Sequence, residues 1–202
     1  MALVTTDILK EYLPEVTGTG ANTELSNLLE RVESAIARWL GFSAPDGSNT
    51  PTLEVSTYTL YIDSYWYGNR SVLQLPIKPV VTITSVHSDP DREYNSDSEV
   101  HSDEYEIDKQ AGLLIIKPTV STVGFSNAYR SNKVVGTFGF TLFHKDLIHA
   151  VCVLASQLHR AKSSQGKKSQ SVRNATTTYM PNVIPEEVRQ LLYPYRASEQ
   201  IL

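Results

Sequence analysis

The apolar residues of this sequence change their period twice, and this change is the strongest constraint on the fold. Between Asn22 and Gly41 they recur at helical spacing, with most charged residues on the other face. From Val55 onwards apolar and polar residues alternate, as they do in strands. The helical spacing returns between Lys145 and Lys162. This order predicts an α+β chain with N-terminal helices, a central antiparallel β-sheet region and C-terminal helices.

Proline and glycine mark the ends of the expected elements. Proline is tolerated in the first turn of a helix but not in its interior, and glycine closes helices in a left-handed conformation. Pro185 therefore marks a helix start, and Pro14, Gly41 and Pro194 mark helix ends. The expected elements are short helices over 5–14 and from Pro185 to Pro194, a helix over 22–41, a β region over 54–140 and a long C-terminal helix over 145–162.

Six stretches of the β region have the composition of strands. Turn signals separate them at a spacing typical of meanders. Gly68 and Asn69 fit a hairpin tip, because both residue types tolerate positive backbone angles. In chain order the stretches are VSTYTLYID, SVLQL, PVVTITSV, EYEID, GLLIIKP and SNKVVGTFGF.

Two prolines, Pro76 and Pro79, stand directly before the third of these strands. Proline cannot donate a hydrogen bond to a strand ladder, so it belongs at the start of a strand, on an edge or at a bulge. It also biases the residue before it towards extended geometry. The sequence therefore predicts a stiff corner that sets the entry angle of a core strand.

The chain has 202 residues, which suits one domain with an appendage, since domains typically have ~100–200 residues. The range 162–178 is polar, contains glycine and serine and has no acidic residue, a composition typical of a flexible linker. We expect a body over 1–162. A flexible basic linker and a C-terminal docking helix are expected over 163–202.

The formal net charge of −4 conceals an asymmetry between the two halves of the chain. Met1 to Lys109 contains 7 Lys+Arg and 18 Asp+Glu, a balance of −11. Gln110 to Leu202 contains 11 and 4, a balance of +7. Such polarity is typical of an oriented assembly or of a polyanionic partner, and also arises from chance and solubility.

Nothing in the sequence favours an enzyme, a metal site or a membrane protein. The single cysteine, Cys152, excludes an internal disulfide and lies inside an apolar helical pattern, where a nucleophile is poorly exposed. The five histidines have no metal-ligand spacing. No apolar run reaches the ~18 residues that span a bilayer, and Asp7 and Glu11 do not fit a signal peptide. We expect a soluble, unsecreted protein without catalytic activity, cofactor or metal.

Acidic residues alternate along the stretch SDPDREYNSDSEVHSDEYEID, in a pattern that superficially resembles a calcium loop. Such a loop requires glycine at its sixth position and a bidentate glutamate at its twelfth. Tyr94 and Val100 occupy those positions here. The sequence therefore favours a solvated hairpin arm. Its alternating carboxylates are Asp89, Asp91, Glu93, Asp97 and Glu99.

A basic cluster follows the expected helix over 145–162. Such a cluster can contact phosphates by charge alone, but it lacks the interleaved aromatic residues of a stacking platform for single strands. An exposed linker, or a loop that folds onto an acidic protein partner, fits equally well. The cluster consists of Arg160, Lys162, Lys167, Lys168 and Arg173.

Taken together, the order of these segments resembles the head–tail adaptor (head-completion or connector) proteins of tailed phages. The stretch LLERVESAIARWLGF looks like the second helix of that family, and LQLPIKPVVTITSV is similar to its turn into a strand. VVGTFGF, DLIHAVCVLASQLHRAK and VRQLLYPYR are similar to its glycine–aromatic strand end, its following helix and its C-terminal segment. The resemblance covers most of the chain. The stretches 89–108 and 163–179 are long for a minimal adaptor.

The resemblance implies a structural protein of the virion neck, between capsid and tail, assembled in the host cytoplasm. It implies a ring of twelve identical subunits under the portal protein, extending the DNA channel and docking the next neck or tail protein. DNA is implied only in passage, and no membrane. The portal-docking residues expected from this are Val183, Val188, Leu191, Leu192, Tyr193, Tyr195 and Arg196. The acidic arm, Asp89, Asp91, Glu93, Asp97 and Glu99, is expected to face the channel or a neighbouring ring.

Two alternatives remain open at this stage. Another neck or tail-completion protein, such as a stopper or a tail terminator, is typically more purely β, and the helical ends argue against it. A nucleic-acid-binding module would use the basic linker, and salt-dependent DNA affinity would reveal it.

Overall fold

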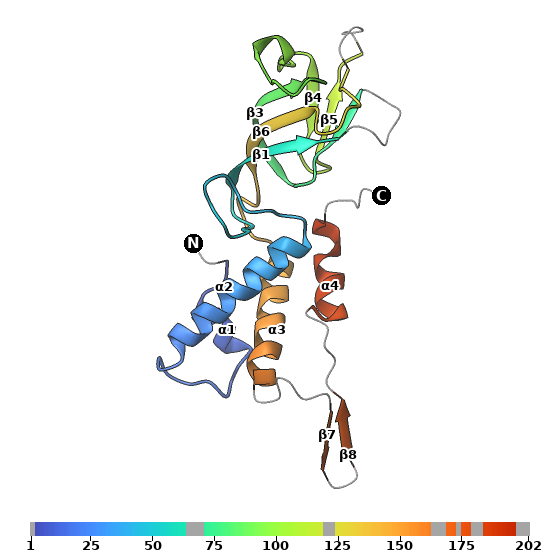
Figure 1. The fold of residues 1–202 in the computed structure, drawn as a ribbon. Helices are drawn as coiled ribbons and strands as arrows, with labels where there is room; N and C mark the ends of the chain where they lie inside the picture. The colour runs from blue at the N-terminus through green and yellow to red at the C-terminus, as the bar shows by residue number, and fades with distance from the viewer. Residues whose placement is uncertain are drawn as a thin grey trace. The chain divides into compact units, whose positions relative to one another are not determined.

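In the computed structural model, the chain divides into two compact units (Figure 1). The helical unit comprises Met1–Ile36 and Phe143–Pro194, and the β-rich unit comprises Ala37–Leu142 and Tyr195–Leu202. The predicted α+β class is confirmed. The structure describes residues 3–63, 71–118, 124–162, 169–172, 175–178 and 184–196, with the backbone alone at 169–172 and 175–178.

Four helices occupy the predicted positions. α1 spans Thr6–Glu11, α2 Asn22–Trp39, α3 Lys145–Ala161 and α4 Glu186–Leu192, followed by a 3-10 turn over Tyr193–Tyr195. The expectation of a long C-terminal helix is not confirmed, because α3 has 17 residues, one fewer than α2. The predicted helix ends are close to the observed ones. Gly41 follows α2 with a φ of +97°, and its left-handed conformation allows the Phe42 N–H to reach the Ala37 carbonyl at 2.9 Å.

The core of the helical unit is apolar and involves all four helices. α1 and α4 pack against α3. The apolar stripe of α2 is buried through Leu25, Leu29 and Val32. On α4, Val188 and Leu192 are fully buried. α4 is therefore part of this core, and the compact units do not follow the predicted boundary at residue 162.

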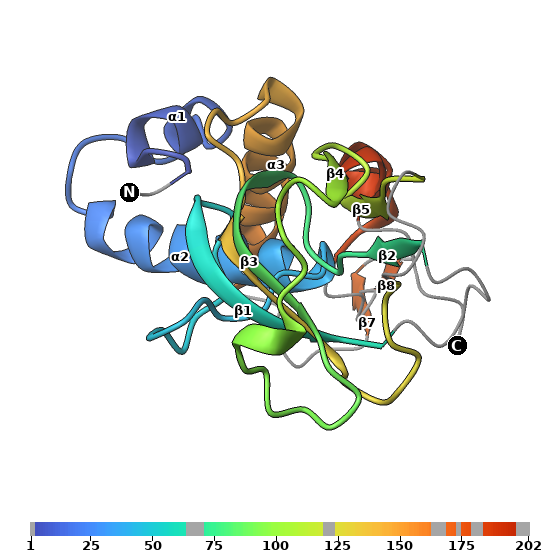
Figure 2. The same ribbon diagram turned by 90° about the horizontal axis from the view of Figure 1, so that it is seen from above.

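Six strands of the β-rich unit coincide with the six predicted stretches, and their order can be followed in Figures 1 and 2. They form two three-stranded antiparallel sheets, β1–β6–β3 and β2–β5–β4. In these two sheets only β4 and β5 are neighbours both in sequence and in space, so the meander expectation is wrong. The strands are β1 Ser56–Ile62, β2 Val72–Gln74, β3 Val80–Ser88, β4 Tyr105–Asp108, β5 Leu113–Ile116 and β6 Asn132–Phe138.

β6 is the central strand of the first sheet, and a glycine lets it approach β3 closely. A Cβ placed on Gly136 would lie 2.5 Å from the Thr82 carbonyl oxygen, well inside van der Waals contact. Nearby, β3 carries register shifts between Val80 and Thr82 and between Ile83 and Ser85. Among the described residues of this unit, Tyr58, Phe125 and Phe138 have the largest fully buried side chains.

The predicted proline corner joins the two sheets. Pro79, whose peptide bond to Lys78 is cis, directly precedes β3. The turn between β4 and β5 holds the corner, because the Leu75 N–H donates to the Gly112 carbonyl at 2.8 Å and the Val80 N–H donates to the Lys109 carbonyl at 2.9 Å.

The range 163–178, predicted as a linker without regular structure, contains two paired strands. β7 spans Ser169–Val172 and β8 spans Ala175–Thr178, antiparallel, with Ser169 opposite Thr178. The polar composition concealed this hairpin. The predicted hairpin tip at Gly68 and Asn69 lies outside the described residues.

Candidate interaction surfaces

Asp89, the first carboxylate of the predicted acidic arm, is turned inward. It is 7% exposed, and its two carboxylate oxygens accept the backbone N–H groups of Asp91 at 2.9 Å, Glu93 at 3.0 Å and Tyr94 at 2.8 Å. These hydrogen bonds, chiefly that from Tyr94, lower the pKa of Asp89 below its ordinary value of 3.8. Asp89 thus holds a tight loop, and the prediction that its charge faces outward is wrong.

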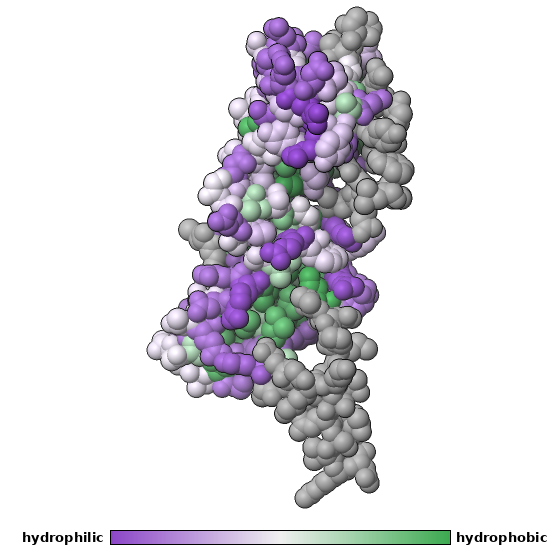
Figure 3. Space-filling model, viewed as in Figure 1, coloured by the Kyte–Doolittle hydropathy of each residue, from purple (hydrophilic) through white to green (hydrophobic). Residues whose placement is uncertain are grey.

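The other predicted arm carboxylates, Asp91, Glu93, Asp97 and Glu99, are exposed. They lie on an irregular loop with a short 3-10 helix over Ser96–Ser98, rather than on a hairpin arm. Figure 3 shows that hydrophilic side chains dominate the visible surface of the β-rich unit. We call these four residues the acidic loop.

The acidic loop does not form a calcium site within the described part of the chain. Asp89 begins the alternating pattern, but both of its carboxylate oxygens accept hydrogen bonds from backbone N–H groups. Asp89 and the neighbouring carboxylates therefore do not point toward one common cation position. No group of three or more His, Cys, Asp or Glu side chains among the described residues is arranged to hold a metal ion.

A cluster of aromatic and cationic side chains that sequence reasoning missed lies beside this loop. The Arg130 guanidinium lies 4.8 Å from the centroid of the Tyr61 ring, and the Lys133 ammonium lies 5.4 Å from that of Tyr94. The two tyrosine rings are 5.5 Å apart. The Tyr94 hydroxyl donates to the Arg130 carbonyl, and the Arg130 N–H donates to the Asp63 carboxylate. We call Tyr61, Tyr94, Arg130 and Lys133 the aromatic–cation patch.

Two buried polar residues next to Arg130 in the chain form hydrogen bonds that hold the loop of this patch. Ser131 and Asn132 have no exposed surface. The Asn132 amide donates to the Ser126 carbonyl at 2.9 Å and to the Ile62 carbonyl at 3.2 Å, and the Ser131 hydroxyl lies 2.7 Å from the Ala128 carbonyl oxygen. This network fixes the loop that carries Arg130. The only signal in the sequence was a serine–asparagine pair at a strand start, which also marks ordinary turns.

The predicted portal-docking residues divide into buried and accessible ones. Val188 and Leu192 are fully buried in the helical unit, whereas Tyr193 is 72% exposed and Leu191 is half-buried. Within the β-rich unit, Tyr195 packs edge-to-face on Phe140 with ring centroids 5.7 Å apart. The Arg196 guanidinium there lies 5.0 Å from the Trp39 ring centroid. Val183 lies outside the described residues. Tyr193 is the large apolar residue of this set that a partner can reach.

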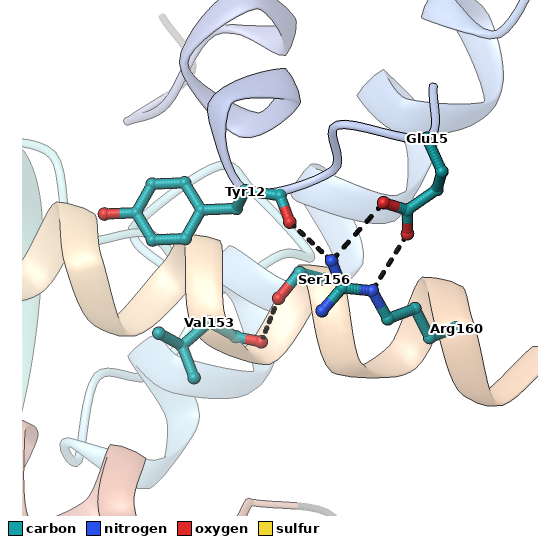
Figure 4. Close-up of polar contacts among 5 residues, drawn as sticks. All are labelled: Tyr12, Glu15, Val153, Ser156 and Arg160. Atoms are coloured by element: carbon teal, nitrogen blue, oxygen red, sulfur yellow. Dashed lines mark hydrogen bonds and ion pairs between the residues drawn. The ribbon is translucent and has the colours of Figure 1, made fainter.

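Arg160 and Lys162, the first two members of the predicted basic cluster, form ion pairs within the helical unit. Arg160 contacts Glu15 at 2.9 Å and also donates to the Tyr12 carbonyl at 2.8 Å (Figure 4). Lys162 contacts Glu24 at 2.6 Å. These pairs lower the pKa values of Glu15 and Glu24. The other cluster members, Lys167, Lys168 and Arg173, lie outside the described residues.

A groove of about 260 Å³ lies beside the ion pair of Lys162 with Glu24. Half-buried Leu28 and Leu158 form its apolar part. The remaining lining residues are Glu24, Arg31, His159 and Lys162. Glu24 and Lys162 both line the groove and are paired with each other. We therefore interpret the groove as a gap in the packing between α2 and α3.

Cys152 is confirmed as a buried free cysteine. Burial raises the pKa of its thiol to about 11, so the thiolate that would act as a nucleophile is scarce near neutral pH.

Of the histidines, His149 lies 2.9 Å from the Tyr12 hydroxyl and joins α3 to the residue after α1. No described helix is long and apolar enough to cross a bilayer.

No family model and no curated protein matches this chain. Solved structures that contain chains with a similar fold include three from gene transfer agent particles. A chain of the virion of a native gene transfer agent particle has a TM-score of 0.56 and 18% identity over 98% of this chain and 91% of its own length. A chain of the native particle's neck, computed with C12 symmetry, has a TM-score of 0.51 and 19% identity over 91% and 94%. A chain of the empty particle's neck, computed with C6 symmetry, has a TM-score of 0.52 and 16% identity over 95% and 89%.

Proposed function

We propose that this protein is a structural component of the neck of a phage-like particle, and specifically its head-to-tail adaptor. In this role identical subunits form a ring under the portal protein, extend the DNA channel and dock the next neck or tail protein. The protein contributes shape and surface contacts, and it has no catalytic step and needs no cofactor.

One observation carries this proposal: the fold similarity to neck chains extends over nearly the whole length of both proteins. It covers 91% and 95% of this chain and 94% and 89% of the neck chains. A shared supersecondary motif would cover only part of each chain. The C12 and C6 symmetry of those neck reconstructions supports a ring for this chain too. The fold alone does not define a function, so the test must be made on particles.

Tyr193 is the residue through which we propose contact with the portal. Its ring is 72% exposed at the end of α4, and tyrosine is enriched among residues that dominate binding energy. The buried neighbours Val188 and Leu192 position it. Deleting the whole C-terminal segment is a poor test, because it would open the helical core, and a point substitution is required.

Neither alternative function gains a specific observation. Stoppers and tail terminators are expected to be more purely β, whereas helices form one of the two units here. A nucleic-acid-binding module would use the basic cluster, but Arg160 and Lys162 are each paired with a carboxylate. The paired carboxylates offset the positive charge that these two members of the cluster offer to phosphates.

The test is to determine whether the protein is a stoichiometric component of particles. Phage-like particles from cells that produce this protein are purified, and its copy number relative to the portal protein is measured by quantitative mass spectrometry. Cryo-electron microscopy of the neck then locates it. We expect a ring at the portal. Absence from intact particles, or a position in the capsid shell or the tail tip, would overturn the proposal.

The docking residue is tested by Tyr193→Ala, with Gln190→Ala as the matched control, because Gln190 is also exposed on the same helical segment. We expect Tyr193→Ala to leave unfolding unchanged and to weaken co-sedimentation with tailless, portal-bearing capsids by roughly tenfold or more, as truncation of an interface anchor typically does. Equal binding by both variants would exclude Tyr193 as the anchor.

A further inference from the structure

The aromatic–cation patch combines residue types that are common in binding surfaces, and its two cationic side chains have no ion-pair partner within the described part of the chain. Arg130 and Lys133 form no ion pair with a described residue, although each lies over a tyrosine ring. Tyr61 is 42% exposed, and Tyr129, next to Arg130 in the chain, is 67% exposed. Tyrosine and arginine are the residue types most enriched at the centres of protein interfaces.

We propose that this patch binds the acidic loop of a second copy of the chain. The Arg130 guanidinium lies over the Tyr61 ring, and its N–H groups make no hydrogen bond to a described residue, so they remain for a planar, doubly accepting group. A carboxylate has that geometry. The Lys133 ammonium adds a second positive charge near the Tyr94 ring. A partner with two or more closely spaced carboxylates therefore fits the patch.

The chain itself carries such a segment. Asp91, Glu93, Asp97 and Glu99 are exposed, and none of them forms an ion pair with a described residue. Asp97 and Glu99 flank Ser98 at the short 3-10 helix, so two carboxylates lie close together on an ordered loop. The positive patch and the negative loop are two different surfaces, each without an ion pair to a described residue of its own subunit, and the patch of one subunit is complementary to the loop of another.

The patch is preorganised, which lowers the cost of binding. Arg130 and Tyr94 both have positive φ, 52° each, a conformation that residues other than glycine seldom adopt. Asp89 holds the backbone at Tyr94, and Asp63 holds the backbone at Arg130. Two carboxylates and two strained residues therefore fix the positions of the side chains of this surface, and such strain is typical of functional surfaces.

This inference deepens the proposed function and rests on it, because a closed ring requires contacts between different surfaces of like subunits. Sedimentation velocity of the purified full chain at low ionic strength measures association directly. We expect concentration-dependent association that high salt weakens. A carbodiimide, which joins an ammonium to a carboxylate, is then expected to couple Lys133 of one copy to Asp97 or Glu99 of another, identified by mass spectrometry.

Charge-reversal variants test whether the patch of one subunit pairs with the acidic loop of another. One variant carries Arg130→Glu and Lys133→Glu, and a second carries Asp97→Lys and Glu99→Lys. We expect each alone to associate roughly tenfold more weakly than wild type, and an equimolar mixture of the two to associate like wild type, because each reversed surface then meets its complement. The control Arg31→Glu with Lys145→Glu changes the net charge as the first variant does, at exposed positions of the helical unit, and should leave association unchanged.

Each result decides the inference. A wild-type chain that stays monomeric at high concentration and low salt overturns it, and so does a mixture that fails to recover association although both variants are folded by circular dichroism. Loss of DNA affinity in the first variant without loss of association would assign the patch to nucleic acid instead. If particles contain the protein as a ring but the reversed variants still form that ring, the proposed function stands and this interface is wrong.

Discussion

The two units of this protein use their carboxylates in opposite ways. In the helical unit, Glu15 and Glu24 reach across to cations on or just after α3, at 2.9 and 2.6 Å. In the β-rich unit, Asp89 and Asp108 accept backbone N–H groups instead, Asp108 from Gln110 at 3.1 Å and from Ala111 at 2.9 Å. Both of these ion pairs lie within the helical unit.

The cause of this difference lies in the backbone. A helix satisfies most of its own N–H groups, so its side chains are left to pair with each other. An irregular loop leaves N–H groups without partners, and burying them unsatisfied is costly. The loop after β3 solves this with Asp89, and the turn after β4 with Asp108. A count of acidic residues therefore overstates the charge that the β-rich unit presents outward.

The largest predicted effect tests how far the β-rich unit depends on its backbone geometry. Gly136→Ala places a Cβ 2.5 Å from the Thr82 carbonyl oxygen, where neither strand of the central pair can move freely. We expect a loss of about 3 kcal/mol or more in the free energy of unfolding, measured by urea denaturation.

Gly20→Ala is the matched control in the helical unit, because a Cβ there meets no atom within 4 Å and the backbone angle is ordinary. Its stability should stay within about 0.5 kcal/mol of wild type. A similar loss in both variants would mean that the close approach of β3 and β6 is not what Gly136 serves.

The next prediction concerns the inward carboxylate and its dependence on pH. The folded pKa of Asp89 lies below its ordinary value of 3.8. A lowered pKa stabilises the fold at pH values above the unfolded pKa, and this contribution is lost as the pH falls through the folded one. Asp89→Asn should therefore lower the melting temperature by several degrees at neutral pH. At strongly acidic pH the difference should shrink, because Asp89 is then protonated as well.

Asp91→Asn is the control, since Asp91 is exposed and its side chain makes no hydrogen bond to a described group. Differential scanning calorimetry across the acid range measures both variants. A pH-independent loss for Asp89→Asn would assign the effect to the altered hydrogen-bond geometry of the amide rather than to the charge.

Much of the fold could be predicted because it depends on local patterns. The apolar period located all four helices of the helical unit and the six strands of the β-rich unit within a few residues. Gly41 and Pro79 marked real boundaries, since each restricts the backbone by its own chemistry. The strand order β1–β6–β3 was not predictable, because pairing between distant strands leaves no mark on local alternation.

The candidate surfaces were harder to predict for the same reason. Asp89 looks like its acidic neighbours in the sequence, and only the turn of the chain at Arg92 and Tyr94, both with positive φ, brings amides onto its oxygens. Tyr61 and Arg130 are 69 positions apart and meet only after β1 and β6 pair. The resemblance and the composition of the C-terminal segment predict Val188 and Leu192 as docking residues, whereas tertiary packing buries both of them.

The smallest predicted effect concerns the ion pair of Glu15 with Arg160 in the helical unit. Glu15 and Arg160 are about half-exposed, at 47% and 54%, so water and salt screen their attraction. Glu15→Gln keeps the size of the side chain but removes its charge. We expect only a slight fall in melting temperature at low ionic strength, and none in high salt, with the exposed Glu30→Gln on α2 as the control. A large, salt-independent loss would show that the Arg160 bridge to Glu15 and the Tyr12 carbonyl acts as a structural hydrogen-bond network. In that case the stability of both units would depend on carboxylates. The units would then differ only in the donor, which is a guanidinium side chain in the helical unit and a backbone N–H in the β-rich unit.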